Sequence, residues 1–164
     1  MHQILNPTLV ICAAILALPQ AAAQSSFTII ASGNSTDTNS DGTAISGNDG
    51  QGAFLWTSSG GYQPLGPQSA VGVSEDGTTV LGQMDDPATG DNVAGLWTSP
   101  TGWVNLGNFG GGCGSDVANP YDLAGDGNTA VGLGWLGCTG IAFRWTVGGG
   151  LMPIPHLGSG SARA

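Results

Sequence analysis

Residues 70–106 read AVGVSEDGTTVLGQMDDPATGDNVAGLWTSPTGWVNL, and this stretch decides the fold. Asp76-Gly77 stands between two short runs rich in β-branched residues, a pattern typical of a hairpin with a type I′ turn. We expect paired strands at 70–74 and 78–83, a third strand at 93–98, and a fourth at 103–106. The stretch therefore predicts one four-stranded antiparallel meander.

The same pattern occurs three times along the chain. The copies share an Asp-Gly pair (Asp41, Asp76, Asp126), a Trp-Thr pair (Trp56, Trp97, Trp145) and a Leu-Gly pair (Leu65, Leu106, Leu157). Repetition at this period indicates an array of small supersecondary units. We expect a β-repeat domain over 24–164, with units at about 27–66, 67–112 and 113–158 and the start of a fourth at 159–164.

The first and third copies predict matching strands. In the first copy they fall at 43–46, 53–57 and 62–65, with 27–31 as a leading strand. In the third copy they fall at 121–124, 129–133, 141–147 and 151–157. Pro153 and Pro155 cannot donate to a ladder, so the last segment is expected at a sheet edge.

Composition supports an all-β fold class. Gly accounts for 30 of the 164 residues, and no helical period is found beyond the N-terminal segment. Tandem four-stranded antiparallel sheets predict a β-propeller-like array of about three blades, incomplete or open, whereas closed propellers have about four to eight. We expect a fragment, a truncated reading frame, or an open array that a partner or self-association completes.

The N-terminus predicts export. Residues 8–18 carry no charge, Pro19 follows, and Ala21-Ala22-Ala23 offers a small-residue cleavage site before Gln24. We interpret residues 1–23 as a signal peptide, with an uncleaved anchor as the alternative because the segment lacks Lys and Arg. The expected location is secreted, extracellular or cell-surface, or the periplasm, and no membrane span is expected after cleavage.

The charge balance limits the classes of partner. The formal net charge is −9, and the sequence contains two Arg residues, Arg144 and Arg163, and no Lys. Such acidity disfavours nucleic acid and anionic membranes as partners, and it is typical of a soluble Gly-rich β-protein. An unknown protein or carbohydrate surface remains as the partner.

Two cysteines follow the predicted signal peptide. Cys113 and Cys138 form an even pair in an exported chain, which predicts a disulfide closing a loop of about 25 residues and contributing about 3 kcal/mol. A metal site would need more ligands than these two and His156 offer.

Three motifs together resemble the HAF repeat of bacterial extracellular proteins. They are Val73-Ser-Glu-Asp-Gly-Thr-Thr-Val-Leu-Gly82, Ala142-Phe-Arg-Trp-Thr146 and Leu106-Gly-Asn-Phe-Gly-Gly111. The resemblance covers essentially all of the chain after the signal peptide. It implies propeller-type modules on secreted or surface proteins, and it carries over no catalytic residue.

One motif suggests a cation site. Asp37, Asn39 and Asp41 spell the front half of a calcium loop, in which alternating side-chain oxygens surround the ion. The closing acid of such a loop is missing, because Asn48 stands at the twelfth position and Ile45 at the ninth. We expect a plain hairpin here, with calcium as the alternative and no other cofactor.

Other motifs favour no enzyme class. Residues 132–137 fit G-x-G-x-x-G, but Gly137-Cys138-Thr139-Gly140 cannot begin the helix that a dinucleotide site requires. No G-x-S-x-G elbow accompanies His156, and Asp85, Asp86 and Asp91 share one polar loop. We expect no catalytic residues.

One tryptophan stands out from the repeat, while Trp103 aligns with Tyr62 and Leu151 of the other copies. Trp56, Trp97 and Trp145 recur in register and are expected to pack between sheets, whereas Trp135 has no counterpart in the other copies. Trp135 and Trp103 are the candidate ligand contacts, each with a packing role as the alternative.

The sequence thus predicts a secreted structural or binding module without catalysis. The alternatives are the N-terminal part of a secreted hydrolase, or of an autotransporter passenger, whose remaining domain lies beyond Ala164.

Overall fold

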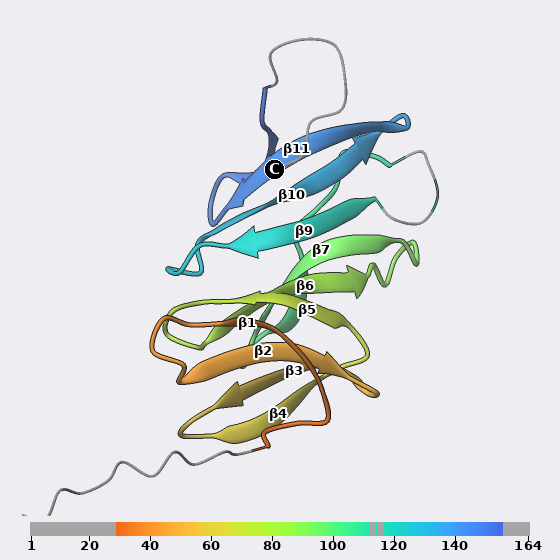
Figure 1. Cartoon of the computed structure of the whole chain (residues 1–164). Helices are drawn as coiled ribbons and strands as arrows, with labels where there is room; N and C mark the ends of the chain where they lie inside the picture. Colours follow the sequence, from red (N-terminus) through yellow and green to blue (C-terminus); the bar gives the residue numbers. More distant parts are fainter. Residues whose placement is uncertain (1–28, 112–113, 115–116, 156–164) are drawn as a thin grey trace, which may run out of the picture.

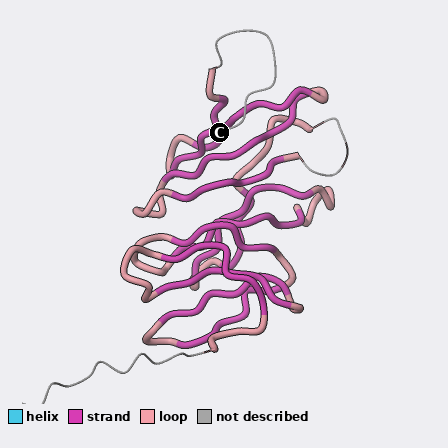
Figure 2. The backbone as a smooth tube through the Cα atoms, viewed as in Figure 1, coloured by secondary structure: helices cyan, strands magenta, loops and turns pink. Residues whose placement is uncertain are grey.

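The computed structural model describes residues 29–111, 114 and 117–155. Over these ranges the chain forms strands joined by turns and loops, without a helix (Figures 1 and 2). The strands are β1 (Gly33–Thr38), β2 (Ala44–Asp49), β3 (Gly52–Thr57), β4 (Gly61–Gly66), β5 (Ser69–Val73), β6 (Thr79–Asp85), β7 (Asn92–Thr98), β8 (Gly102–Asn105), β9 (Ala118–Leu123), β10 (Thr129–Leu136), β11 (Thr139–Thr146) and β12 (Gly150–Pro153).

Consecutive strands form three four-stranded sheets: β1 to β4, β5 to β8 and β9 to β12. The pairings within each sheet are antiparallel, and the sheets follow one another along the molecule (Figure 1). The predicted tandem meanders are confirmed. Because β12 ends the third sheet, Pro153 lies on an edge strand as predicted.

The Asp-Gly loops are not the predicted type I′ turns. That turn needs positive φ at both central residues, but only Gly42 has it, at 71°, and Asp41 does not. The Gly42 N–H donates to the Asn39 carbonyl at 3.1 Å, and the Asn39 N–H donates to the Ala44 carbonyl at 3.1 Å. The loop is therefore longer than two residues and needs left-handed backbone at Gly alone, and equivalent bonds recur at Gly77 and Gly127.

The first strand lies later than predicted. Residues 29–31 are not in a strand, and β1 is instead the polar segment Gly33–Thr38, while residues 27–28 lie outside the described ranges. The Asp-Gly loop connects β2 directly to the segment Gly33–Thr38, so this segment, and not the apolar residues before it, pairs with β2. Pairing from Gly33↔Asp49 to Thr38↔Ile45 follows from that loop.

The sheets pack face to face. In each sheet the Trp of the third strand shares a face with its cross-strand partners, and we call this the Trp face. On the second sheet it carries Val80, Trp97 and Trp103, which pack with Ala44 and Leu55 on the opposite face of the first sheet. The Trp face of the third sheet packs in the same way on the opposite face of the second sheet, which carries Leu81 and Leu96. The residues that the third sheet contributes are Ala130, Phe143, Trp145 and Leu151. The predicted packing between sheets is confirmed for Trp97 and Trp145, whereas the prediction is wrong for Trp56, whose face has no neighbouring sheet among the described residues.

A glycine on the second strand of each sheet makes room for an aromatic ring. A Cβ added at Gly47 would lie 2.4 Å from Phe54 Cζ, and one added at Gly132 would lie 2.6 Å from Phe143 Cζ. In the second sheet Gly95 replaces the Phe, and the ring above Gly82 is that of Trp103. A β8 side chain thus occupies the space that a third-strand Phe fills in the other two sheets.

Polar contacts also join neighbouring sheets. Asn48 makes two hydrogen bonds to the backbone of Ala70, at 2.9 and 2.7 Å, and Gln83 at the equivalent position donates to Asn119 at 2.6 Å. The Asp-Gly loops connect through Glu75, whose carboxylate accepts from Ser40 and whose N–H donates to the Gly125 carbonyl at 2.7 Å. The three loops therefore lie on the same side of the stack (Figure 1).

Candidate ligand-binding groove

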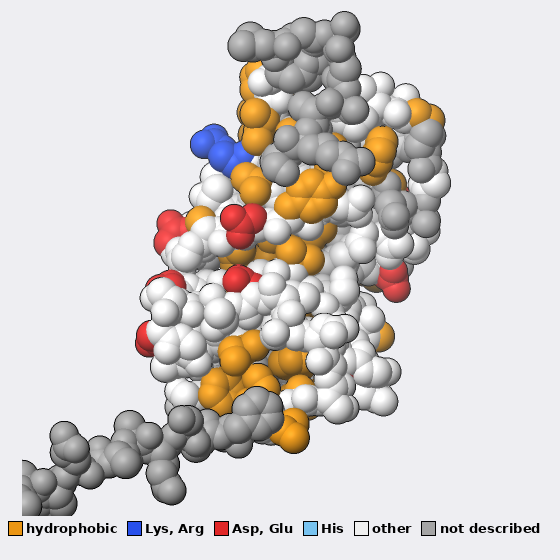
Figure 3. Space-filling view, in the orientation of Figure 1, with side chains coloured by type: hydrophobic (Ala, Val, Ile, Leu, Met, Phe, Trp, Pro, Cys, Tyr) orange, Lys and Arg blue, Asp and Glu red, His pale blue; other side chains and the backbone are white. Residues whose placement is uncertain are grey.

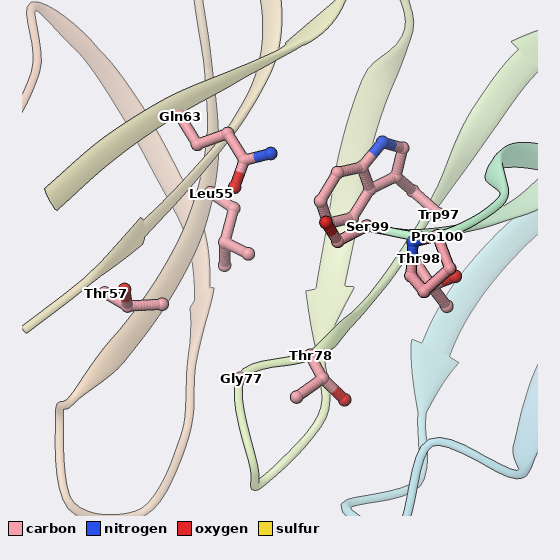
Figure 4. Close-up of a pocket in the computed structure, with 9 residues that line it drawn as sticks. All are labelled: Leu55, Thr57, Gln63, Gly77, Thr78, Trp97, Thr98, Ser99 and Pro100. Atoms are coloured by element: carbon pink, nitrogen blue, oxygen red, sulfur yellow. The ribbon is translucent and has the colours of Figure 1, made fainter. Parts of the chain in front are cut away.

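An open groove of about 540 Å³ lies between the first and second sheets. It is lined by Leu55, Thr57, Gln63, Gly77, Thr78, Trp97, Thr98, Ser99 and Pro100 (Figure 4). Leu55 and Gln63 are cross-strand partners on β3 and β4, so they share one face and point toward Trp97 of β7. Sheet packing therefore creates the groove, because it brings β3 and β4 opposite the β7–β8 turn.

The polar lining of the groove is neutral. The Thr57 hydroxyl accepts the Gly60 N–H at 3.0 Å, and the Thr98 and Thr101 hydroxyls share a bond of 2.7 Å. Among the described residues, no hydrogen bond engages the Gln63 amide or the Ser99 hydroxyl, and both side chains are exposed. These two groups are available to a ligand, and no charged side chain lines the groove.

The acidic loop next to the groove is stabilised in its ionised form. The Ser74 hydroxyl donates to Asp76 at 2.7 Å, and the Thr78 N–H and hydroxyl donate at 3.0 and 2.8 Å. These bonds lower the pKa of the Asp76 carboxyl below its ordinary value. In the first loop, the Thr43 hydroxyl and N–H lower the pKa of Asp41 in the same way.

A second polar pair lies on the first sheet. The Tyr62 hydroxyl donates to Asp49, which lowers the pKa of the Asp49 carboxyl and raises the pKa of Tyr62. The ring of Tyr62 lies 5.4 Å from that of Phe54, centroid to centroid. The pair fixes the position of Tyr62 at the exposed edge strand.

The candidate calcium residues bond to backbone and neighbouring side chains instead. Asp37 accepts the Val73 N–H at 2.9 Å, Asn39 accepts the Ala44 N–H at 2.8 Å, and Asp41 accepts from Thr43. Asn39 also donates to the Glu75 carbonyl at 2.9 Å and is buried. All three side chains therefore have hydrogen-bond partners within the loop or in the neighbouring sheet. Calcium binding at this loop stays a prediction.

Trp103 lies within the packing between sheets. It is half-buried against the first and third core clusters, and its indole N–H donates to the Leu65 carbonyl at 2.8 Å. The indole N–H that would orient a ligand is therefore already used. These contacts favour a packing role for Trp103.

Trp135 lies on β10 and is half-buried. Its backbone bonds to Val117 and Gly111, and its indole N–H is buried without a hydrogen-bond partner among the residues that the structure describes. Gly132 and Gly134 are within the same strand, and the turn at Gly137 leads into β11, so the G-x-G-x-x-G string begins no helix. Ligand contact at Trp135 stays a prediction.

Other sequence-predicted features fall wholly or partly outside the described ranges. Cys113, His156, the signal peptide at 1–23 and the segment at 159–164 lie outside them, so the Cys113–Cys138 disulfide stays a prediction. Within the described ranges, no cluster of three or more His, Cys, Asp or Glu residues is placed to hold a metal ion. In the same ranges, no helix is long and apolar enough to cross a membrane.

The groove was not predicted from the sequence. The repeat pattern predicts a packing role for Trp97, Gln63 has Val104 and Met152 at the equivalent positions, and Ser99 matches Ser58 of the first copy without signalling a ligand. Figure 3 shows apolar side chains gathered in patches on one face of the molecule and acidic side chains mostly along the left of the view. Arg144 is the one Lys or Arg residue in the described part of the chain.

Two solved structures resemble this chain. One is assigned as TolB from Agrobacterium tumefaciens, with a TM-score of 0.55, 13% identity, and coverage of 76% of this chain and 46% of that one. The other is TolB from Acinetobacter baumannii, with a TM-score of 0.51, 18% identity, and coverage of 76% and 32%. The matched region spans less than half the length of either protein. The likeness shows the fold, a β-propeller-like array, and confirms the predicted fold class. No family model and no curated protein matches the chain.

Proposed function

We propose that this protein is a secreted, non-catalytic binding module of propeller type, and that the groove between its first two sheets takes a neutral carbohydrate. The observation that carries the proposal is the lining of the groove. Pro100 is exposed, the mostly buried Leu55 and Trp97 form the apolar floor of the groove, and hydroxyls lie around them together with the amide of Gln63. Sugars present apolar C–H faces and hydroxyl groups side by side, so this mixture suits them.

The charge of the protein supports a neutral ligand. With a formal net charge of −9, the chain repels polyanions at long range, and the groove contributes no cation to offset this. Export agrees with such a role, and the resemblance to HAF repeats supports it. N-terminal sequencing of the exported protein should begin at Gln24, whereas an uncleaved N-terminus would contradict the signal peptide.

Binding is tested with a panel of neutral oligosaccharides derived from β-glucan, chitin and mannan. We expect calorimetric binding of at least one class, and at least tenfold weaker binding by Gln63→Ala and Ser99→Ala. Ser59→Ala, an exposed serine that does not line the groove, serves as the matched control and should bind like the unaltered protein. Failure of the whole panel at millimolar concentration would overturn the carbohydrate assignment.

Mass spectrometry of the same oligosaccharides after incubation tests the second half of the proposal. Their masses should be unchanged. Shortened products that persist in a repurified sample would show catalysis and would reject the description of a binding module.

A further inference from the structure

Two sheet faces have no neighbouring sheet among the described residues. One is the Trp face of the first sheet, with Ile45, Trp56 and Tyr62, none of which belongs to a core cluster. The other is the face of the third sheet that carries Arg144 and Met152. Tyr62 is 39% exposed, whereas its counterparts Trp103 and Leu151 are half-buried. Arg144 is exposed, whereas its counterparts Leu55 and Leu96 are buried beneath the next sheet.

We propose that a second copy of this chain covers both faces, so that two chains joined head to tail form one closed ring. The described residues of one chain form three sheets, and those of two chains form six, within the range of about four to eight found in closed propellers. One chain cannot join its own two faces, because the first and third sheets lie at opposite ends of the stack (Figure 1).

The repeat itself supplies the docking geometry. Twice within the chain, a Trp face packs on the opposite face of the preceding sheet: Trp97 clusters with Leu55, and Trp145 clusters with Leu96. Leu55 and Leu96 directly precede the Trp of their own strand, and Arg144 holds this position in the third sheet. By the same geometry, Trp56 of one copy meets Arg144 of the other.

This third contact has its own chemical complementarity. A guanidinium group lies favourably over an indole ring, most strongly when water is excluded. Arg144 replaces leucine only in the sheet whose face is open, and it is the sole Lys or Arg in the described part of the chain. The opposing open face offers an indole at the matching position.

The open face of the third sheet has a depression into which the Trp56 indole of the second copy fits. An open depression of about 390 Å³ is lined by Arg144, Met152, Pro153, Ile154 and Pro155. Met152 pairs with Arg144 across β11 and β12, as Gln63 pairs with Leu55 across β3 and β4. The depression is therefore the third-sheet counterpart of the Leu55 and Gln63 side of the groove, which Trp97 faces from the second sheet.

Sedimentation velocity of the exported, purified chain tests the proposal. We expect a dimer at micromolar concentration, and at least a tenfold weaker association for Trp56→Ser and for Arg144→Glu. Val147→Glu is the control, since it introduces the same residue at a 63% exposed turn position that does not line the depression at Arg144, and it should stay dimeric. Far-UV circular dichroism and thermal melts confirm that each variant is folded, and Met152→Glu replaces any variant that is not.

Mixing the variants tests the head-to-tail arrangement. The Trp56→Ser chain keeps an intact Arg144 face, and the Arg144→Glu chain keeps an intact Trp56 face. An equimolar mixture should therefore form heterodimers at a concentration at which each variant alone is a monomer. Absence of heterodimers would reject the head-to-tail geometry. A monomeric parent chain, or dimers that persist in both variants, would overturn the proposal, while carbohydrate binding by the monomer would leave the proposed function intact.

Discussion

Truncation of Phe143 to alanine is the sharpest test of how the sheets are held together. Its side chain is 0% exposed, clusters with residues of the second and third sheets, and lies over Gly132, where no Cβ separates ring from backbone. Loss of the buried ring removes about 2–3 kcal/mol of transfer free energy. A void of about 80 Å³ left between two sheets adds about 2 kcal/mol, at about 24 cal/mol per Å³.

We therefore expect Phe143→Ala to lower the free energy of unfolding by about 4 kcal/mol, within the range known for buried Phe. Urea denaturation followed by circular dichroism measures this change through the transition midpoint at constant slope. Val147→Ala is the control, because its side chain is 63% exposed and its loss should change stability by less than about 0.5 kcal/mol. A loss below about 1.5 kcal/mol for Phe143→Ala would refute the close packing over Gly132.

Three further expectations concern side chains and loops. Trp103→Phe should cost about 1–2 kcal/mol in urea denaturation, because a carbonyl that now accepts a 2.8 Å bond loses its donor; an unchanged midpoint would contradict this. Gly42→Ala should lower the free energy of unfolding by about 1–2 kcal/mol, because Ala is strained at the positive φ of this position. Gly77→Ala should lower it further, because the added Cβ would also lie 2.7 Å from the Cβ of Ala44. A lower melting temperature for Gly42→Ala than for Gly77→Ala would contradict this expectation. Because its pKa is lowered in the folded state, Asp76 stabilises the fold above its ordinary pKa of 3.8, and this stabilisation is lost as the pH falls through the pKa of the folded state. On acidification, the melting temperature of Asp76→Asn should therefore fall less steeply than that of the unaltered protein. Parallel curves of melting temperature against pH for the two proteins would contradict this expectation.

The features predicted correctly depend on residues that are close in the sequence, whereas the features predicted wrongly depend on pairing or loop length. Strand order, the meander and the edge position of Pro153 were correct, because each depends on residues adjacent in sequence or on the missing N–H of proline. The start of β1 was wrong because the segment Gly33–Thr38 has no apolar alternation, and only its pairing with β2 makes it a strand. The turn type was wrong because φ at Asp41 depends on loop length, which two letters do not specify.

The candidate site was decided almost wholly by tertiary structure. Gln63 and Ser99 lie 36 residues apart in the sequence and line one groove only because the second sheet packs on the first. The sequence aligns Trp103 with Tyr62 and Leu151, but only the structure places its ring over Gly82, where the other sheets use a Phe.

By itself the sequence determined the repeated unit, its all-β character and the tandem order of the sheets, since short-range turn signals and strand periodicity encode these locally. Only the tertiary structure decided which faces meet, which aromatic fills each glycine hollow, and where a groove and two open faces remain. The physical reason is that packing depends on complementary shape between residues far apart in the chain, and a one-dimensional pattern does not contain that shape.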